Sequence, residues 1–263
     1  MSFERQGTRQ GTRRGTLGVS LRLLVAGGLI GAGLAGLAPS PARAITGGNA
    51  VTDSSFNFVA KVSYSGGTFC TGTLIKSNWV LTAAHCVGGV TNPGDMSVRV
   101  GSNLRDTGGQ VRQAVALYSY PGYSGGHNDI ALLKLESPVT GITPISLADP
   151  GQSFRWDGQQ GGPFTQYDDG VIAGWGQNGT GQLPDRLQFK GVSIMPAGPD
   201  GIGLKSIPTS GGPCPGDSGG PLMVNISGEL FQVGVMKGQN CSTTANYSEV
   251  GAGYLRTWIL EHL

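Results

Sequence analysis

The sequence predicts an all-β fold of short antiparallel strands, closed into barrels or stacked as sheets, with one helix at the carboxyl end. Strand-length apolar stretches recur along the 263-residue chain and are separated by clusters of Gly, Asn, Pro or Asp. Several of them alternate with a period of two, as Met96, Val98 and Val100 do. Helical spacing of apolar residues is evident only near the end of the chain.

Nine stretches have the length and composition of strands, and residues 195–213 do not. In chain order the expected strands are 58–64, 69–75, 79–83, 96–100, 130–135, 171–175, 187–194, 221–226 and 230–236. Residues 195–213 are rich in Pro and Gly and lack periodicity, so we expect a loop there. The final helix is indicated by apolar residues at three- and four-residue intervals, namely Tyr254, Leu255, Trp258, Ile259 and Leu263.

Composition favours an ordered fold and excludes nucleic acid as a partner. Hydrophobic residues make up 38% of the chain, which suffices for a core, and the 47 Gly are dispersed among apolar runs. The net charge of +2 depends on residues 1–44, which hold six Arg and one acidic residue. The remainder has a formal charge of about −3, so it lacks the clustered basic side chains that bind phosphates.

Residues 1–44 have the pattern of an export signal. An Arg-rich start precedes the uncharged run 23–38, which is too short and too rich in Gly for a stable membrane span of about 20 residues. Ala42-Arg43-Ala44 is a small-x-small cleavage pattern, so we expect a secreted domain of residues 45–263. Arg13-Arg14 fits a twin-arginine signal, and an ordinary secretory leader fits the segment equally well.

The four cysteines suggest two disulfides in an exported protein, and their number alone leaves three pairings open. No Cys-x-x-Cys is present, and the three His are scattered, so we expect no structural metal. Between positions 87 and 111 Asp95 and Asp106 are the only acids, too few for a calcium loop. We expect no cofactor.

Three separated motifs carry groups for nucleophilic catalysis. Ser218 lies in Gly-Asp-Ser-Gly-Gly, where small neighbours permit a sharp turn and place the amides of Gly216 and Ser218 near a bound carbonyl. A serine needs a base, and His85, directly before a cysteine, is the candidate. Asp129 stands at the start of a strongly apolar strand, where a partly buried carboxylate can orient an imidazole.

The chain from Ile45 onward resembles the chymotrypsin/trypsin-like serine endopeptidases, in the small bacterial form. The matching pieces are 45–48, 82–86, 128–135, 174–176, 216–222 and the terminal helix with Trp258. The resemblance implies two antiparallel β-barrels packed side by side, at about 45–150 and about 151–252, and a short helix at about 253–263. It places the catalytic groups in the cleft between the barrels.

Carried over position by position, the resemblance assigns the catalytic roles. Ser218 is the nucleophile, His85 the general base and then the acid, and Asp129 the residue that orients His85. The amides of Gly216 and Ser218 form the oxyanion hole. The implied disulfides are Cys70–Cys86 and Cys214–Cys241.

The resemblance also implies an activation step. In the family a new amino terminus of Ile-x-Gly-Gly type inserts into the body and pairs with the acid before the nucleophile. Ile45 and Asp217 occupy these positions. The cleavage pattern ends at Ala44, so we hypothesise that export cleavage itself creates the competent terminus.

The specificity pocket departs from the trypsin branch. Gly212 stands where that branch has an aspartate, so cleavage after Arg or Lys is not expected. Gly238 can still pair with the backbone of an extended peptide. Met236 and Lys237 replace residues of a Ser-Trp-Gly stretch, and Met236 cannot supply the hydroxyl that often supports the catalytic aspartate.

The sequence therefore predicts a secreted serine endopeptidase that acts through an acyl-enzyme on protein or peptide substrates, and we expect a monomer. The alternative is a catalytically silent homologue that serves as a binding or adhesion module. An esterase of different fold fits less well, because its Gly-x-Ser-x-Gly elbow joins a strand to a helix and its histidine comes last in the chain.

Overall fold

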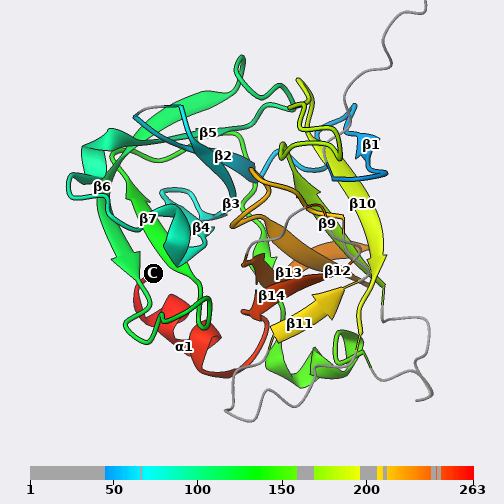
Figure 1. The fold of residues 1–263 in the computed structure, drawn as a ribbon. Helices are drawn as coiled ribbons and strands as arrows, with labels where there is room; N and C mark the ends of the chain where they lie inside the picture. The colour runs from blue at the N-terminus through cyan, green and yellow to red at the C-terminus, as the bar shows by residue number, and fades with distance from the viewer. Residues whose placement is uncertain are drawn as a thin grey trace, which may run out of the picture. The chain divides into compact units, whose positions relative to one another are not determined.

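The computed structural model describes residues 45–65, 67–158, 169–195, 206–209, 212–237, 241 and 244–263, of which 206–209 are described by their backbone. Figure 1 shows these residues as two groups of β-strands, with the α-helix near the carboxyl end of the chain. The export signal predicted for residues 1–44, and Gly238 of the predicted pocket, lie outside the described residues.

The first group of strands is a closed barrel. Its strands are β2 (Val59–Tyr64), β3 (Phe69–Lys76), β4 (Trp79–Thr82), β5 (Met96–Val100), β6 (Gln110–Ser119) and β7 (Ala131–Leu135). They follow the order β2-β3-β4-β7-β6-β5, and every pair is antiparallel. The alternation of Met96, Val98 and Val100 directs these three side chains into the barrel, where each is at most 1% exposed.

The second group is an eight-stranded sheet with the path β1-β10-β9-β12-β13-β14-β11, to which β8 adds by parallel pairing with β13. Its strands are β1 (Asn49–Ala50), β8 (Ser146–Leu147), β9 (Asp169–Gly174), β10 (Gln188–Ser193), β11 (Ser206–Thr209), β12 (Pro221–Ile226), β13 (Glu229–Met236) and β14 (Ala245–Glu249). Ser227 and Gly228 both have positive φ and form the two-residue turn that joins β12 to β13.

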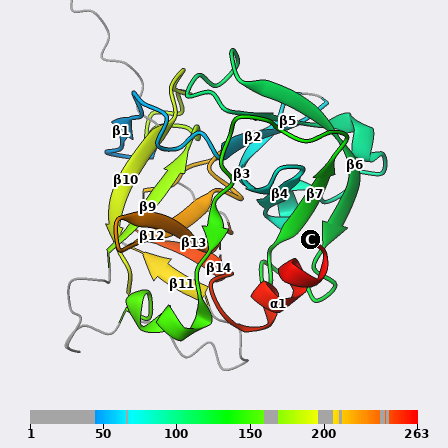
Figure 2. The ribbon, with the colours of Figure 1, turned by 180° about the vertical axis from the view of Figure 1, so that it is seen from behind.

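One α-helix, α1 (Gly253–Glu261), ends the chain beside the barrel, as the red ribbon in Figure 2 shows. Leu255 and Ile259 are its buried residues, whereas Tyr254 and Leu263, which the sequence pattern also assigned to the apolar stripe, are 42% and 37% exposed. Short 3-10 turns are Ala84–Cys86, Pro93–Asp95 and Pro150–Arg155. Over the part of the chain that the structure describes, none of the helices has the length and apolarity to cross a membrane.

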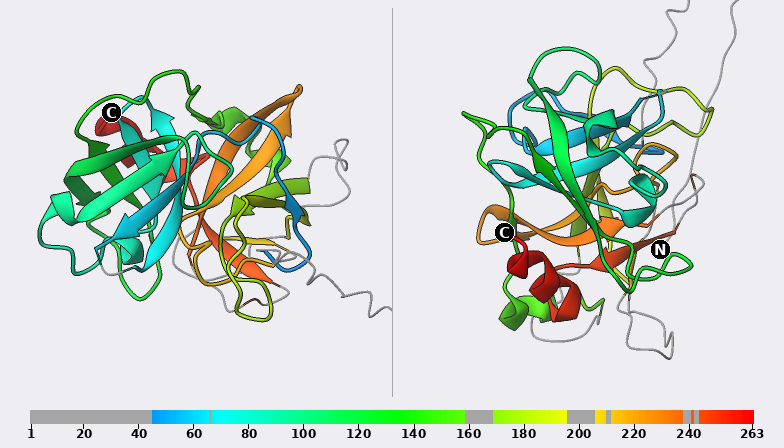
Figure 3. Two further views of the ribbon diagram at one scale, coloured as in Figure 1. Left: turned by 90° about the horizontal axis from the view of Figure 1, so that it is seen from above. Right: turned by 90° about the vertical axis from the view of Figure 1, so that its left-hand side faces the viewer.

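A shared hydrophobic cluster joins the two groups of strands, which lie side by side in the left panel of Figure 3. Trp79 and Ile130 of the barrel belong to it together with Ala173, Trp175 and Val235 of the sheet. A second cluster fills the barrel and a third lies on the sheet. Because the first cluster bridges the two groups, it fixes the position of loops from one against loops from the other.

The predicted all-β fold with a terminal helix is confirmed, and all nine expected strands are present within a few residues. One expectation was wrong: residues 206–209, assigned to a loop, form β11, which pairs with β14. β11 contains Pro208 and has no apolar alternation, so its sequence gives no sign of a strand. It is a strand because its backbone pairs with β14. β6 and β14 were also missed, since β6 has one fully buried residue, Ala114, and β14 contains few apolar residues.

Candidate active site

His85 and Asp129 are brought together by the pairing of β4 with β7. Thr82 pairs with Ala131, so the segment after β4 meets the segment before β7. The His85 ring nitrogen Nδ1 lies 2.6 Å from Asp129 Oδ2, and the His85 backbone N–H donates to Oδ1 at 2.9 Å. With Nδ1 protonated toward the carboxylate, Nε2 is left as the nitrogen that can accept a proton.

Asp129 is held in place by its surroundings. It is 1% exposed, and it follows Asn128, whose φ of 55° is a left-handed conformation that Asn tolerates well. The Asn128 side chain donates to Gly122 O at 2.9 Å and accepts from the Tyr254 hydroxyl of α1 at 2.5 Å. Burial and then the charge of Asp129 raise the pKa of nearby Tyr123, so that hydroxyl stays protonated and is no rival base.

Ser218 lies on a turn between Cys214 and β12. Gly219, with φ of 78°, follows it, and a Cβ there would overlap Thr82 Oγ1 and the Thr71 carbonyl. The turn is closed by the Gly220 N–H, which donates to Asp217 O at 2.9 Å, and by the Gly219 N–H, which donates to Met236 O at 2.9 Å. A glycine is therefore required at position 219 by its close approach to β3 and β4.

The same turn carries the backbone N–H groups of Gly216 and Ser218, the predicted oxyanion donors. Among the described residues, neither of these two N–H groups donates a hydrogen bond to the protein. Gly216 has φ of 99°, and a Cβ on it would lie 2.9 Å from Gly176 Cα. Free backbone donors on a closely packed turn are suited to an anion that develops during a reaction.

His85, Ser218 and Gly216 line one cavity of about 380 Å³. Its other walls include Phe69, Val90 and the disulfide Cys70–Cys86, so it is largely apolar beside the polar groups. In the described residues no hydrogen bond joins Ser218 Oγ to His85 Nε2, which lies 3.6 Å from Cys86 Sγ. Such contacts are often long without substrate and shorten in the complex.

Two disulfides flank the site. Cys70 of β3 is bonded to Cys86, directly after His85, and Cys214 of the turn that carries Ser218 is bonded to Cys241. The sulfur atoms of Cys70 and Cys86 lie within 4.8 Å of a His85 nitrogen, but both are in the disulfide and offer no thiolate to a metal.

Asp217, next to Ser218, is a buried carboxylate held by backbone amides. It is 2% exposed, and it accepts from Gly176 N–H at 2.7 Å and from Cys214 N–H at 2.9 Å. A Cβ on Gly174 or Gly176 would overlap this carboxylate, which explains why glycines flank Trp175. Burial raises the pKa of Asp217 to about 7, although the two amides act in the opposite direction.

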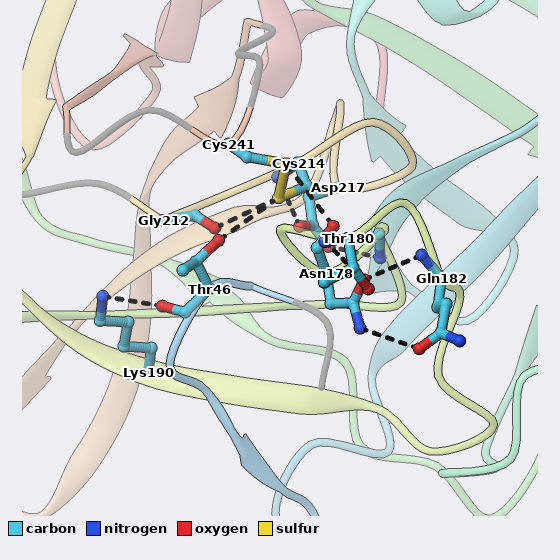
Figure 4. The surroundings of a disulfide bond; sticks show 10 residues. Thr46, Asn178, Thr180, Gln182, Lys190, Gly212, Cys214, Asp217 and Cys241 are labelled. Atoms are coloured by element: carbon cyan, nitrogen blue, oxygen red, sulfur yellow. Dashed lines mark hydrogen bonds between the residues drawn. A yellow bond between two sulfur atoms is a disulfide. The ribbon is translucent and has the colours of Figure 1, made fainter. Parts of the chain in front are cut away.

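The segment that begins at Ile45 packs beside Cys214 and Gly212, as Figure 4 shows for Thr46. The Thr46 N–H donates to Gly212 O at 2.8 Å, and Lys190 Nζ donates to Thr46 O at 3.0 Å. Ile45 is 1% exposed. Gly212, with φ of 118°, lies against this segment, since a Cβ on it would come within 3.4 Å of Ile45 Cγ2 and 3.3 Å of Thr46 O.

Three hydroxyl residues near the site were missed by the sequence reasoning. Ser248 of β14 donates to the Asp129 carbonyl at 3.4 Å, and Thr82 Oγ1 donates to Thr71 O at 2.8 Å. Thr71 Oγ1 in turn donates to Gly216 O at 2.8 Å. Met236 is buried, and its backbone pairs with Gly219 and Gly220. Threonines within strands are common β-formers, so no sequence signal distinguished these residues.

Comparison with known proteins gives one consistent result. The family model described as Trypsin matches residues 45–259. Trypsin alpha of Drosophila erecta is 30% identical over 248 residues, covering 86% of this chain and 90% of that protein. Trypsin delta of Drosophila melanogaster is 30% identical over 246 residues (86% and 91%), and trypsin alpha-4 of Lucilia cuprina is 30% identical over 242 residues (86% and 89%).

Proposed function

The chain belongs to the trypsin family, and we propose that it is a serine endopeptidase whose catalytic groups are Ser218, His85 and Asp129. The observation that carries the proposal is the 2.6 Å contact between His85 Nδ1 and the buried Asp129 carboxylate, beside a cavity that His85 and Ser218 both line. A fixed imidazole with one nitrogen free is the base that a serine nucleophile requires.

In the proposed reaction, Ser218 Oγ attacks the carbonyl carbon of a peptide bond, and its proton passes to His85 Nε2. The carbonyl electron pair moves to oxygen, where the Gly216 and Ser218 amides stabilise the charge. The imidazolium returns the proton to the leaving nitrogen as the C–N bond breaks, which leaves an acyl-enzyme. Water then attacks the acyl carbon, gives its proton to His85, and the proton passes to Ser218 as the acid departs.

We propose that maturation removes residues 1–44 during export and leaves Ile45 as the amino terminus. Two observations support this. Asp217 is buried, and burial raises its pKa to about 7. A neighbouring cation would stabilise the charged carboxylate and so offset the free-energy cost of its burial. Ile45 has φ of 50°, which a β-branched residue rarely adopts. This strain involves the carbonyl group of residue 44, so cleavage before Ile45 removes it. The new amino group would pair with Asp217.

We propose that the residue before the scissile bond is apolar and not Arg or Lys. Gly212 offers no carboxylate to a buried substrate cation, which would then lack a partner. All the proposed catalytic groups belong to one chain, which supports activity as a secreted monomer on protein or peptide substrates. Profiling the cleavage of a peptide library reads this preference directly, and cleavage predominantly after Arg or Lys would contradict it.

Labelling with a fluorophosphonate tests the proposed function. We expect the secreted wild type to be labelled and Ser218→Ala to remain unlabelled, with a loss of kcat of at least about 10⁴-fold. Ser54→Ala, which alters an exposed serine, is the control and should be labelled like the wild type. A loss below about tenfold in Ser218→Ala would reject the assignment, and an unlabelled wild type would favour a silent binding homologue.

A further inference from the structure

Thr71 of β3 makes hydrogen bonds at two points of the turn that carries Ser218, which we call the serine turn (residues 214–220). It is fully buried, at 0% exposure. Its hydroxyl donates to the Gly216 carbonyl at 2.8 Å, and its backbone N–H donates to the Ser218 carbonyl at 2.8 Å. The two acceptors are the carbonyls of the residues whose amides face the proposed oxyanion.

The Gly216 carbonyl needs such a partner because the residue itself has little conformational restraint. Glycine lacks a Cβ, and at φ of 99° its backbone can rotate more freely than that of any other residue. Rotation at Gly216 would move its own N–H and the chain that leads to the Ser218 N–H. The Gly216 carbonyl belongs to the planar peptide between Gly216 and Asp217, and the Gly216 and Ser218 N–H groups belong to the peptides on either side of it. Holding this carbonyl therefore limits the rotation of both donors, which must lie within about 3 Å of the developing charge.

Thr71 is itself held from the histidine side. Thr82, three residues before His85, donates its hydroxyl to the Thr71 carbonyl at 2.8 Å. The Thr71 side chain is also closely packed against Gly220 of the serine turn, since a Cβ on Gly220 would lie 3.2 Å from Thr71 Cγ2. Two separate hydrogen bonds, from the Thr82 hydroxyl to the Thr71 carbonyl and from the Thr71 hydroxyl to the Gly216 carbonyl, thus connect β4 to the serine turn through β3.

We propose that Thr71 is a positioning residue, whose hydroxyl holds the Gly216 peptide so that the Gly216 and Ser218 amides point at the oxyanion. The inference rests on the proposed function, because it assigns a purpose to these amides. It predicts an effect on the transition state and not on substrate binding, since the carbonyl of a bound substrate makes weaker hydrogen bonds than the oxyanion.

Thr73 offers a matched control for a purely structural role. It lies two residues along the same strand and is likewise 0% exposed. Its hydroxyl donates to Gln232 Oε1 at 2.6 Å, so it also satisfies a buried acceptor, but this acceptor belongs to β13 and not to the serine turn. Loss of either hydroxyl should lower the melting temperature, and only loss of the Thr71 hydroxyl should alter catalysis.

The test compares Thr71→Val, Thr71→Ser and Thr73→Val in the mature secreted protein. We expect kcat on a peptide amide to fall about tenfold or more in Thr71→Val, with KM within about twofold, because a displaced donor loses part of the 10²–10³-fold worth of an oxyanion contact. Affinity for a peptide boronic acid, which mimics the tetrahedral intermediate, should fall by the same factor. Thr71→Ser should recover kcat to within about threefold, since it keeps the donor.

Equal kcat in Thr71→Val and Thr73→Val would overturn the inference, and so would a change confined to KM. Thr71→Ala, which removes the hydroxyl without placing a methyl group against the carbonyl, replaces Thr71→Val should that variant fail to fold. The proposed function fails separately: it falls if Ser218→Ala keeps its activity, whatever Thr71 does.

Discussion

At the scale of single residues, Asp217 has the most unusual electrostatic state among the described carboxylates that border the site. It is 2% exposed and its pKa is raised to about 7 from 3.8, chiefly by desolvation. Within the described part of the chain, two amide donors are its hydrogen-bond partners, and both are neutral. Its charge is therefore costly in the uncleaved chain, and an added cation would remove the cost.

The uncleaved chain should lose stability as the pH rises. The folded-state pKa of Asp217 exceeds the unfolded value, so its stabilising contribution is complete below about pH 4 and is lost as the pH rises through about 7. A shift of this size corresponds to on the order of 4 kcal/mol. A protein that begins at Ala44 should therefore unfold at lower denaturant concentration at pH 7 than at pH 4.

Asp217→Asn supplies the control, because it removes the titrating group and keeps one of the two acceptor oxygens. The lost acceptor lowers stability at both pH values, so the comparison uses the difference between pH 4 and pH 7. In the chain that begins at Ala44, this variant should lack most of the decline between pH 4 and pH 7. A decline of equal size in both proteins would show that other groups cause it.

The residues that could be found from the sequence are those with distinctive neighbours. Ser218 lies among glycines and His85 directly precedes a cysteine, so their surroundings are unusual. Thr71 and Thr82 could not be found, since their function depends on which carbonyls the strands bring near. Their hydrogen bonds join positions 11 and 145 residues apart in the chain.

At the scale of secondary structure, strands were predictable where burial imposes a pattern. β5 alternates because one face fills the barrel, and β7 is almost continuously apolar because four of its five residues are buried. β6 lacks such a pattern, since Val111 and Val115 are 43% and 54% exposed. β11 and β14 are recognised through their mutual pairing, which no local pattern contains.

The helix α1 provides a test of packing at this scale. Ile259 is 0% exposed and lies in the cluster shared by the barrel and the sheet, whereas neighbouring Leu260 is 46% exposed. We expect Ile259→Ala to lower the free energy of unfolding by about 2–5 kcal/mol, through lost burial and a cavity. Leu260→Ala should change it by about 0.5 kcal/mol or less.

Denaturant unfolding of both variants measures the difference. Equal effects of the two substitutions would mean that α1 does not pack on the body through the Ile259 side. Catalytic assays of the same proteins would show whether the hydrogen bond from the Tyr254 hydroxyl to Asn128 still positions Asp129 when the packing of the helix is weakened.

At the scale of the whole molecule, the site depends on the packing of the barrel against the sheet. His85 and Asp129 come from the barrel, and Ser218 comes from the turn before β12 of the sheet. Trp79, Trp175 and Val235 belong to the cluster between them. The sequence alone predicted the members of the candidate site, but the expectation that they converge followed from the family resemblance, because long-range packing leaves no local signature.

In the proposed mature protein, the amino group of Ile45 pairs with Asp217, which directly precedes Ser218, so its titration should affect activity. A free α-amino group has a pKa near 7.7–8.0, and pairing with Asp217 would raise it in the folded state. The contribution of the pair is then complete below the unfolded value and is lost as the pH rises through the folded one. We expect kcat/KM of the protein that begins at Ile45 to fall in alkali, together with its thermal stability.

The protein that retains Ala44 cannot bury a charged amine at this position, so it should have much lower kcat/KM at neutral pH. Amino-terminal sequencing of the secreted protein identifies which form the cell makes. Full activity in the Ala44 form, or an unchanged rate far above the pKa range of a free α-amino group, would show that the anchor does not form.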